Sequence, residues 1–275
     1  MYDIEFASWS CRRHTSILTL GAVAMADNTL KLLREVLDEV HGLVSTVHFS
    51  AESRQHLLAG ALLGRVLEIA EGVYATLERR DSACGYILLR SLMEVHMDLR
   101  ILEKHPGHDE VMRAAWLNQQ KGILERAVEK GSMSPFLKSI AGEAGAKELL
   151  DEVRSTLLEF KEREVKPMSI REKFEKAGQF DYYEGPYNDL SWNTHSNVNV
   201  LLRRHLRFVD GGVEIRAFDP ISDVEMDIIS DVVAGVVANS LVAAKNITGE
   251  GASDCDLGLL TQKLAKFRAT LRRYD

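Results

Sequence analysis

The sequence predicts an all-α protein, a multi-helix bundle of about eight helices with one small β-hairpin near residues 206–218. Three observations lead to this fold class. Apolar residues recur three and four positions apart along almost the whole chain, which is the spacing of amphipathic helices. The few prolines lie where these periodic runs begin or end. The spacing changes to alternation only in L-R-F-V-D-G-G-V-E-I-R-A-F, whose Asp210-Gly211-Gly212 is typical of a hairpin turn.

Length, composition and charge indicate an ordinary folded protein. A chain of 275 residues, 45% hydrophobic and 27% charged, can bury a large core, and we expect a single helical domain over residues 1–275. The net charge of −7 excludes a generally basic surface for coating nucleic acid. Three scattered cysteines, no C-x-x-C pair and no apolar signal core near the N-terminus indicate a cytoplasmic protein without a membrane segment.

The first part of the chain is expected to form five helices. The N-terminal helical region could pack as an oligomerisation or peripheral element of the domain. Ser50 is expected to cap the second helix, Pro106-Gly107 to end the third, and Ser134-Pro135 to open the fifth. The expected ranges are 8–47, 51–79, 83–104, 109–130 and 135–165.

The second part alternates short and long helices. Ser169 and Glu172 form a capping box, S-x-x-E, which begins a short helix that stops at Gly178. An aromatic connection, Q-F-D-Y-Y-E-G-P-Y, follows, and Pro186 suits the first turn of a helix that continues to about residue 206. After the hairpin, Ser222 leads into a helix buried on most sides, up to residue 246. A final helix is expected over 253–273.

The helix after Pro186 carries an unusual polar stripe. An α-helix turns about 100° per residue. This places Asn188, Ser191, His195 and Asn199 on one line, with Trp192 beside it. A surface stripe would normally use Lys, Glu and Arg, whereas short Asn, Ser and His side chains suit fixed hydrogen bonds. We therefore expect the stripe in the interior or in a cleft. The candidate binding residues are Ser191, Asn188, Asn199, Trp192 and Tyr187.

The expected third helix supplies a candidate partner for this stripe. Arg90 and Glu94 lie four residues apart on a largely apolar surface, so they are expected to be paired or to line a cavity. Side chains of the stripe could satisfy the remaining guanidinium donors. The candidate catalytic residues are therefore His195, Arg90 and Glu94, and a purely structural ion pair between Arg90 and Glu94 remains the alternative.

Two short motifs resemble a known family. R-S-L-M-E-V-H-M-D-L and the later Y-N-D-L-S-W-N-T-H-S resemble an uncharacterised bacterial all-α family, a domain of unknown function with R-x-x-x-E on one helix and S-x-x-x-H on a later one. The matching positions are Arg90, Glu94, Ser191 and His195, within a resemblance that covers about 59–246. The resemblance implies an all-α fold and no established activity.

A more distant resemblance is to the HEPN superfamily, helical bundles that include dimeric, metal-independent ribonucleases of toxin–antitoxin and phage-defence systems. Their signature is an arginine followed four to six residues later by a histidine. Three pairs have about this spacing, namely Arg90 with His96, Arg34 with His41, and Arg100 with His105. The resemblance implies RNA cleavage with Arg90 as the cation and either His195 or His96 as the base.

The sequence favours a binding or regulatory module with an inward polar cluster. The alternative is a HEPN-like ribonuclease or nucleotide-binding protein of a defence or toxin–antitoxin system. No cofactor or metal site is expected, because the chain has no E-x-x-H, P-loop, Rossmann or EF-hand motif. A homo-oligomer is the expected assembly, RNA or a nucleotide is the ligand under the alternative, and no protein partner can be named.

Overall fold

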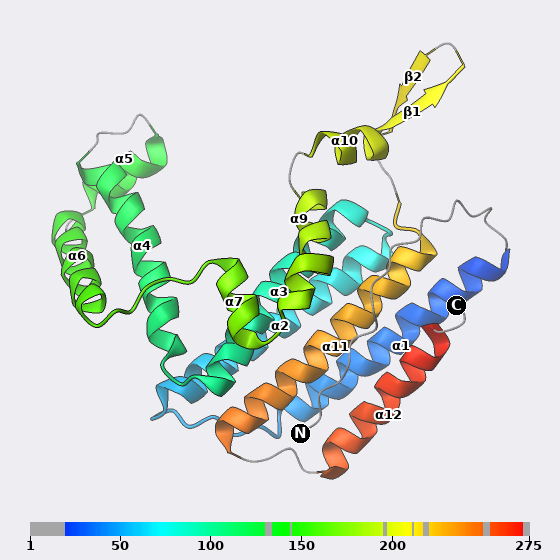
Figure 1. Cartoon of the computed structure of the whole chain (residues 1–275), viewed down its shortest axis with the longest axis horizontal. Helices are drawn as coiled ribbons and strands as arrows, with labels where there is room; N and C mark the ends of the chain where they lie inside the picture. The colour runs from blue at the N-terminus through cyan, green and yellow to red at the C-terminus, as the bar shows by residue number, and fades with distance from the viewer. Residues whose placement is uncertain are drawn as a thin grey trace. The chain divides into compact units, whose positions relative to one another are not determined.

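The computed structural model describes residues 20–129, 134–143, 145–194, 197–210, 212–216, 220–249 and 254–271. Over these residues the protein is all-α with one small antiparallel hairpin, which confirms the predicted fold class (Figure 1). The helices are α1 (Leu20–Val44), α2 (Arg54–Glu78), α3 (Ser82–Lys104), α4 (His108–Val128), α5 (Pro135–Gly142), α6 (Ala146–Glu162), α7 (Ile170–Ala177), α8 (Phe180–Tyr182), the π-helical segment η1 (Tyr183–Tyr187), α9 (Asn188–Thr194), α10 (Val198–His205), α11 (Asp223–Thr248) and α12 (Asp254–Leu271).

The chain divides into two compact units. One consists of Met1–Lys104 together with Phe174–Asp275, and the other of His105–Lys173. We call the first the bundle unit and the second the α4–α6 unit. The single domain over residues 1–275 stays a prediction.

Helix α11 forms the centre of the bundle unit, where it packs against α1, α2, α3 and α12 (Figure 1). The side chains of Val233, Ala234, Val237 and Leu241 are completely buried, which confirms the prediction of a helix buried on most sides. Its length and mean hydropathy of 1.6 would also suit a membrane span. The core helix of a folded domain passes the same test, and 78% of this apolar window is buried in the fold.

The α4–α6 unit has its own small core. Ala114, Leu117 and Leu124 of α4 meet Leu150, Val153 and Phe160 of α6. These positions are spaced three and seven apart within each helix, so each helix buries one stripe. Most of the other side chains of both helices are half-buried or exposed.

Several predicted boundaries are wrong. Ser53, not Ser50, caps α2, because its side chain accepts a hydrogen bond from the backbone of His56 at 3.3 Å. The predicted fifth helix is divided into α5 and α6, and Gly145 at the start of α6 has a left-handed φ of +90°, which a glycine adopts without a steric penalty. The predicted capping box at Ser169 and Glu172 is confirmed by hydrogen bonds in both directions.

The aromatic connection is helical rather than a loop. Segments α8, η1 and α9 follow one another without a break from Phe180 to Thr194, and Pro186 lies inside the π-helical segment. Proline has no amide hydrogen to donate, and a local π-turn accommodates that missing bond. The ring of Tyr187 lies 5.0 Å from that of Phe174, which is completely buried. This contact fixes the start of α9 against the bundle.

The predicted hairpin is confirmed, with strands β1 (Leu206–Val209) and β2 (Gly212–Ile215). Val209 pairs with Gly212, which places the chain reversal within the Asp210-Gly211-Gly212 stretch that the sequence indicates. Leu206 pairs with Ile215 and Phe208 with Val213. Because side chains alternate between the faces of a strand, these four apolar side chains share one face of the ribbon.

Candidate functional site

Arg90 of α3 lies at the centre of a polar network with α9. Its Nε donates to Glu94 Oε1 at 3.1 Å and to the Tyr187 hydroxyl at 3.0 Å, and its Nη1 donates to Thr194 Oγ1 at 3.1 Å. The Tyr187 hydroxyl in turn donates to Glu94 Oε1 at 2.6 Å. The guanidinium also lies 5.2 Å from the centre of the Tyr187 ring. We call Arg90, Glu94, Tyr187 and Thr194 the Arg90 network.

The electrostatics of the Arg90 network keep its charges fixed. Burial and the neighbouring Glu94 carboxylate raise the pKa of Tyr187 to about 12, so its hydroxyl stays protonated at neutral pH. Burial alone would lower the pKa of Arg90, but its bonds with Tyr187 and Glu94 raise that pKa above its ordinary value. The arginine therefore stays charged and the tyrosine stays a neutral donor, as expected of a polar contact that holds α3 and α9 together.

The network contains three of the residues singled out in the sequence and one that was missed. Arg90, Glu94 and Tyr187 meet as a group, whereas Thr194 gave no signal because a lone threonine in a helix is common. The neighbouring His195 lies outside the described residues.

The continuous polar stripe is not observed. Helix α9 ends at Thr194, and Asn197 caps a separate helix, α10, by accepting from the backbone of Asn199 at 3.0 Å. The inward placement predicted for Asn199 is wrong, since its side chain is exposed, and Trp192 is also exposed. Of the remaining stripe residues, Asn188 and Ser191 are half-buried on α9. Because α10 is a separate helix from α9, residues on the two helices no longer share one face.

His96, the second candidate base, is part of the core. It is buried, and its Nδ1 lies 2.7 Å from Ser240 Oγ of α11. Burial, together with the positive charge of Arg100, lowers the pKa of His96 to about 3. A histidine that stays neutral and faces another helix can join α3 to α11 but cannot reach a substrate.

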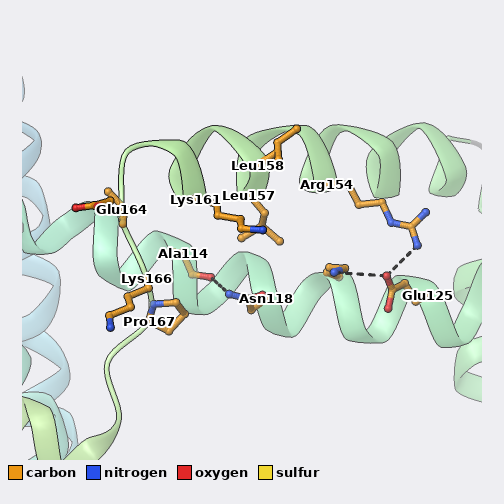
Figure 2. Close-up of a pocket in the computed structure, with 12 residues that line it drawn as sticks. Ala114, Asn118, Glu125, Arg154, Leu157, Leu158, Lys161, Glu164, Lys166 and Pro167 are labelled. Carbon is orange, nitrogen blue, oxygen red and sulfur yellow. Dashed lines mark hydrogen bonds and ion pairs between the residues drawn. The ribbon is translucent and has the colours of Figure 1, made fainter.

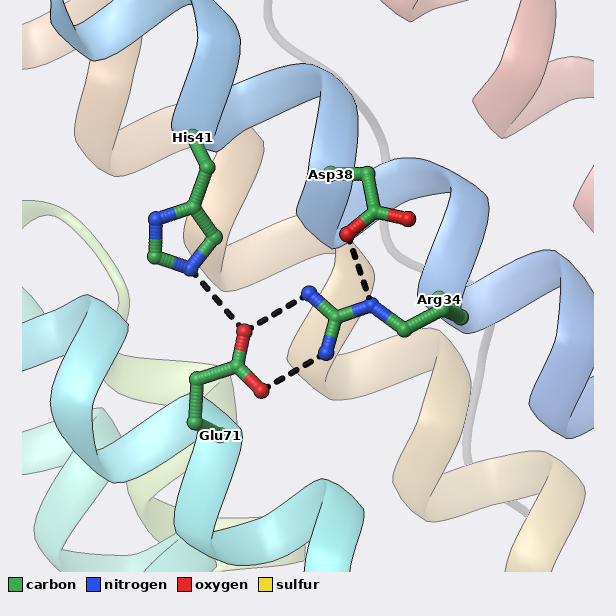
Figure 3. Close-up of polar contacts among 4 residues, drawn as sticks. All are labelled: Arg34, Asp38, His41 and Glu71. Carbon is green, nitrogen blue, oxygen red and sulfur yellow. Dashed lines mark hydrogen bonds and ion pairs between the residues drawn. The ribbon is translucent and has the colours of Figure 1, made fainter.

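A second polar cluster joins α1 to α2 (Figure 3). Both terminal nitrogens of Arg34 donate to Glu71, each at 2.7 Å, and its Nε donates to Asp38 at 2.9 Å. His41 Nε2 lies 2.9 Å from the same Glu71 carboxylate. Arg34 and His41 are seven residues apart, which is two helical turns, so both face α2. The sequence identified this pair by spacing alone, and Glu71 was missed.

Replacing Glu71 by glutamine should reduce the loss of stability in acid. Hydrogen bonds from Arg34 lower the pKa of Glu71 below its ordinary 4.5. A lowered pKa stabilises the fold above the unfolded-state value, and this contribution disappears as the pH falls through the folded-state value. Glu71 is 36% exposed, so the loss is expected to be below about 1 kcal/mol. Urea unfolding between pH 3 and 7 measures it, with Glu68→Gln on the same helix as the control. Equal pH profiles for the two variants would contradict the assignment.

The α4–α6 unit contains an open cleft of about 1010 Å³ between α4 and α6 (Figure 2). Its lining combines four cations, two carboxylates and an apolar floor, and has no histidine, cysteine, serine, threonine or tyrosine. The lining residues are Ala114, Asn118, Lys121, Glu125, Arg154, Leu157, Leu158, Lys161, Glu164, Val165, Lys166 and Pro167. No sequence motif indicated this cleft, because its residues come from two helices and the segment after α6.

The segment formed by α10, β1 and β2, which we call the arm, exposes an unusual amount of apolar surface. Phe208 is 77% exposed, Ile215 84% and Val213 51%. Helix α10 adds further exposed side chains, and the apolar residues exposed on the arm are Val198, Leu201, Leu202, Phe208, Val209, Val213 and Ile215. A contiguous apolar patch on a folded domain usually marks an interaction site.

Arg204 anchors the arm to α3. Arg204 belongs to the basic stretch R-R-H-L-R of residues 203–207, yet its side chain is buried. Its guanidinium donates to Ser82 and lies 5.4 Å from the centre of the Tyr86 ring. The arm is thus held at its base by a buried cation while its apolar residues remain exposed.

Comparison with known proteins finds one family. A family model described as a family of unknown function, DUF5677, matches residues 56–213. No curated protein and no solved structure matches the chain. The matched range contains the whole Arg90 network, the α4–α6 unit and all of the arm up to Val213. Within the described residues, no group of three or more histidine, cysteine, aspartate or glutamate side chains is placed to hold a metal ion.

Proposed function

We propose that this chain, which belongs to the DUF5677 family of unknown function, is a helical binding module that dimerises through its arm. The observation that carries the proposal is the exposed apolar arm. A two-stranded hairpin is only marginally stable in water by itself. Here both strands also expose their apolar face, with Phe208 and Ile215 mostly in solvent. A partner that covers this face would remove the apolar surface from water and stabilise the hairpin.

A second copy of the chain fits the arm. Among the described residues the sheet has two strands, so each strand has an unpaired outer edge. A strand can pair antiparallel with its own copy about a twofold axis. If two β2 strands pair with Ile215 on the axis, Glu214 of each copy lies opposite Arg216 of the other. Oppositely charged residues directly across a strand pair are stabilising.

The amount of apolar surface supports a stable dimer. Phe208, Val213 and Ile215 share one face of the ribbon and are mostly exposed, so a second copy on this face would bury part of the ~800 Å² that each partner buries in a standard interface. Burial of such a surface gives a specific association when the patch is also complementary in shape and charge.

The geometry of the Arg90 network supports binding rather than catalysis at α3. Nε and Nη1 of Arg90 donate to other side chains of the network, and the tyrosine that bridges Arg90 to Glu94 is kept neutral by burial. A phosphate-binding arginine in an active site would instead direct donors towards the substrate. The network therefore acts in this proposal as the joint that holds α9, and through it the arm, on α3.

Sedimentation of the full chain tests the proposal. We expect the wild-type protein to sediment as a dimer at micromolar concentrations and to dissociate on dilution, because the interface is of standard size. A protein that sediments as a monomer at every concentration up to a few hundred micromolar would contradict it. A cytoplasmic location is part of the proposal, and the three scattered cysteines without a C-x-x-C pair support it.

A second candidate function is a HEPN-like ribonuclease at the cluster of Arg34, Asp38, His41 and Glu71. The observation that favours it is the convergence of Arg34 and His41 on one carboxylate, whereas Arg90 and His96 face different helices. Glu71 would hold the Nε2–H tautomer of His41, which leaves Nδ1 to take the proton of an RNA 2′-hydroxyl. Arg34 would stabilise charge on the phosphate.

RNA cleavage by four variants separates the candidate functions. The binding module predicts no cleavage by the wild-type protein and therefore no effect of any variant. Cleavage that is lost in Arg34→Ala and His41→Ala but kept in Arg90→Ala and His195→Ala would support the cluster between α1 and α2. Loss in Arg90→Ala and His195→Ala, with unchanged thermal unfolding, would place a ribonuclease at α3 and contradict the structural role of the Arg90 network.

A further inference from the structure

The cleft of the α4–α6 unit has an uneven distribution of charge. At one end, Arg154 donates to Glu125 at 2.8 Å and to Glu129 at 2.7 Å, so its charge is neutralised. At the other end lie Lys161 and Lys166. Neither of these two lysines has a carboxylate within ion-pair distance in the part of the chain that the structure describes. The second end is therefore locally positive in a protein whose net charge is −7.

The orientation of the side chains strengthens this contrast. Figure 2 shows Lys161 extending from α6 into the space between the two helices, while Glu164 is directed away from it. Between the two ends, the cleft has an apolar floor. Leu157 and Val165 are half-buried there, and Leu158 is 58% exposed. A molecule bound in the cleft can therefore contact both the ammonium group of Lys161 and the aliphatic side chains.

The cleft is better suited to binding than to chemistry. Its lining has none of the hydroxyl, thiol or imidazole groups that act as nucleophiles or bases near neutral pH. One of its carboxylates, Glu125, has a pKa held below its ordinary value by the hydrogen bond from Arg154, so it stays ionised and accepts a proton poorly. The lining also has no aromatic ring on which a nucleobase could stack.

We propose that this cleft binds an amphiphilic anion, an aliphatic chain that ends in a carboxylate or phosphate group. The anionic group pairs with Lys161, Lys166 adds positive charge at the same end, and the chain lies on Leu157, Leu158 and Val165. The volume of about 1010 Å³ is at the upper end of the range for small-molecule sites, which suits an elongated ligand. This site is separate from the arm and does not depend on the dimer.

Calorimetric titration of the full chain with dodecanoate, below its micelle concentration, tests the proposal. We expect saturable binding to the wild-type protein and at least ~tenfold weaker binding to the double variant Lys161→Glu, Lys166→Glu, because the pairing at Lys161 and the positive charge of Lys166 are both replaced by negative charge. Leu158→Asp should weaken binding as well, since it places a charge on the exposed floor. Lys138→Glu, Lys147→Glu is the matched control, because both lysines are exposed on the same unit outside the cleft. It should bind within about twofold of wild type.

Two further ligands identify what the site recognises. Dodecyltrimethylammonium has the same chain with a positive head and should not compete with dodecanoate. Vesicles with and without an anionic phospholipid distinguish a soluble ligand from a membrane lipid. If the natural ligand is a membrane lipid, the wild-type protein should bind the anionic vesicles and the variants at Lys161 and Lys166 should not. If the ligand is soluble, neither protein should bind the vesicles. Thermal unfolding of every variant checks that the fold is intact. No binding of dodecanoate, or equal weakening in the control variant, would overturn the proposal, whatever the result for the dimer.

Discussion

Replacing both Phe208 and Ile215 by aspartate is expected to convert the dimer into a folded monomer. In the wild-type chain these side chains are 77% and 84% exposed, so the substitutions remove almost no contact within one chain. In the dimer they would place four carboxylates on the shared apolar face of the two hairpins, with the two at position 215 on the twofold axis. Burying unpaired charges costs several kcal/mol, so we expect the dissociation constant to rise at least ~100-fold.

Sedimentation of the variant measures the loss of the dimer, and thermal unfolding at low concentration shows whether the monomer remains folded. The double variant Phe136→Asp, Leu259→Asp provides a matched control, because these residues are 66% and 47% exposed but lie outside the arm. The control should remain a dimer. If the arm variant keeps the molar mass of the wild type, or if the control dissociates equally, the arm is not the interface.

Replacing Arg90 by alanine should destabilise the bundle unit by about 2 kcal/mol, a value below that for a fully buried ion pair because Glu94 is 38% exposed. The substitution removes the donors to Glu94, Tyr187 and Thr194 together, and the tyrosine is left beside a carboxylate without its counter-charge. Urea unfolding measures the change in the free energy of unfolding. The joint between α3 and α9 is expected to loosen, so dimerisation through the arm should also weaken.

Two companion variants show whether these residues act as a unit. Tyr187→Phe keeps the ring over the guanidinium but loses the hydroxyl, and we expect a cost of about 1 kcal/mol. In a double-mutant cycle, the loss in Arg90→Ala, Tyr187→Phe should be smaller than the sum of the single losses. An Arg90→Ala protein with unchanged stability would contradict a structural role.

The fold class could be predicted because helical spacing is a local property. The helix buried on most sides, α11, and the hairpin around Asp210-Gly211-Gly212 were both identified correctly. Helix breaks were harder, because they depend on backbone details such as the left-handed Gly145 and the new cap at Asn197. The π-helical segment was missed since proline usually marks a helix start, and the packing of Tyr187 on Phe174, which holds this segment in place, cannot be read from the sequence.

The candidate site was predicted only in part. The pairing of Arg90 with Glu94 follows from their spacing on an apolar helix, and Tyr187 was among the selected residues. Thr194 and Glu71 could not be found in this way, because their role depends on which helices pack together. No sequence pattern indicates the α4–α6 cleft, because single exposed lysines and leucines are common on helices and only the packing of α4 on α6 brings them together. The arm was recognised as a hairpin, but its exposure is a property of the fold.

The claim that the arm is a dimer interface is tested most directly by hydrogen exchange of the full wild-type chain above and below the concentration at which the dimer dissociates. The account predicts that backbone amides of β1 and β2 exchange more slowly at high concentration, while those of α2 exchange at the same rate in both samples. Exchange in residues 206–215 that does not depend on concentration would show that no second copy covers these strands.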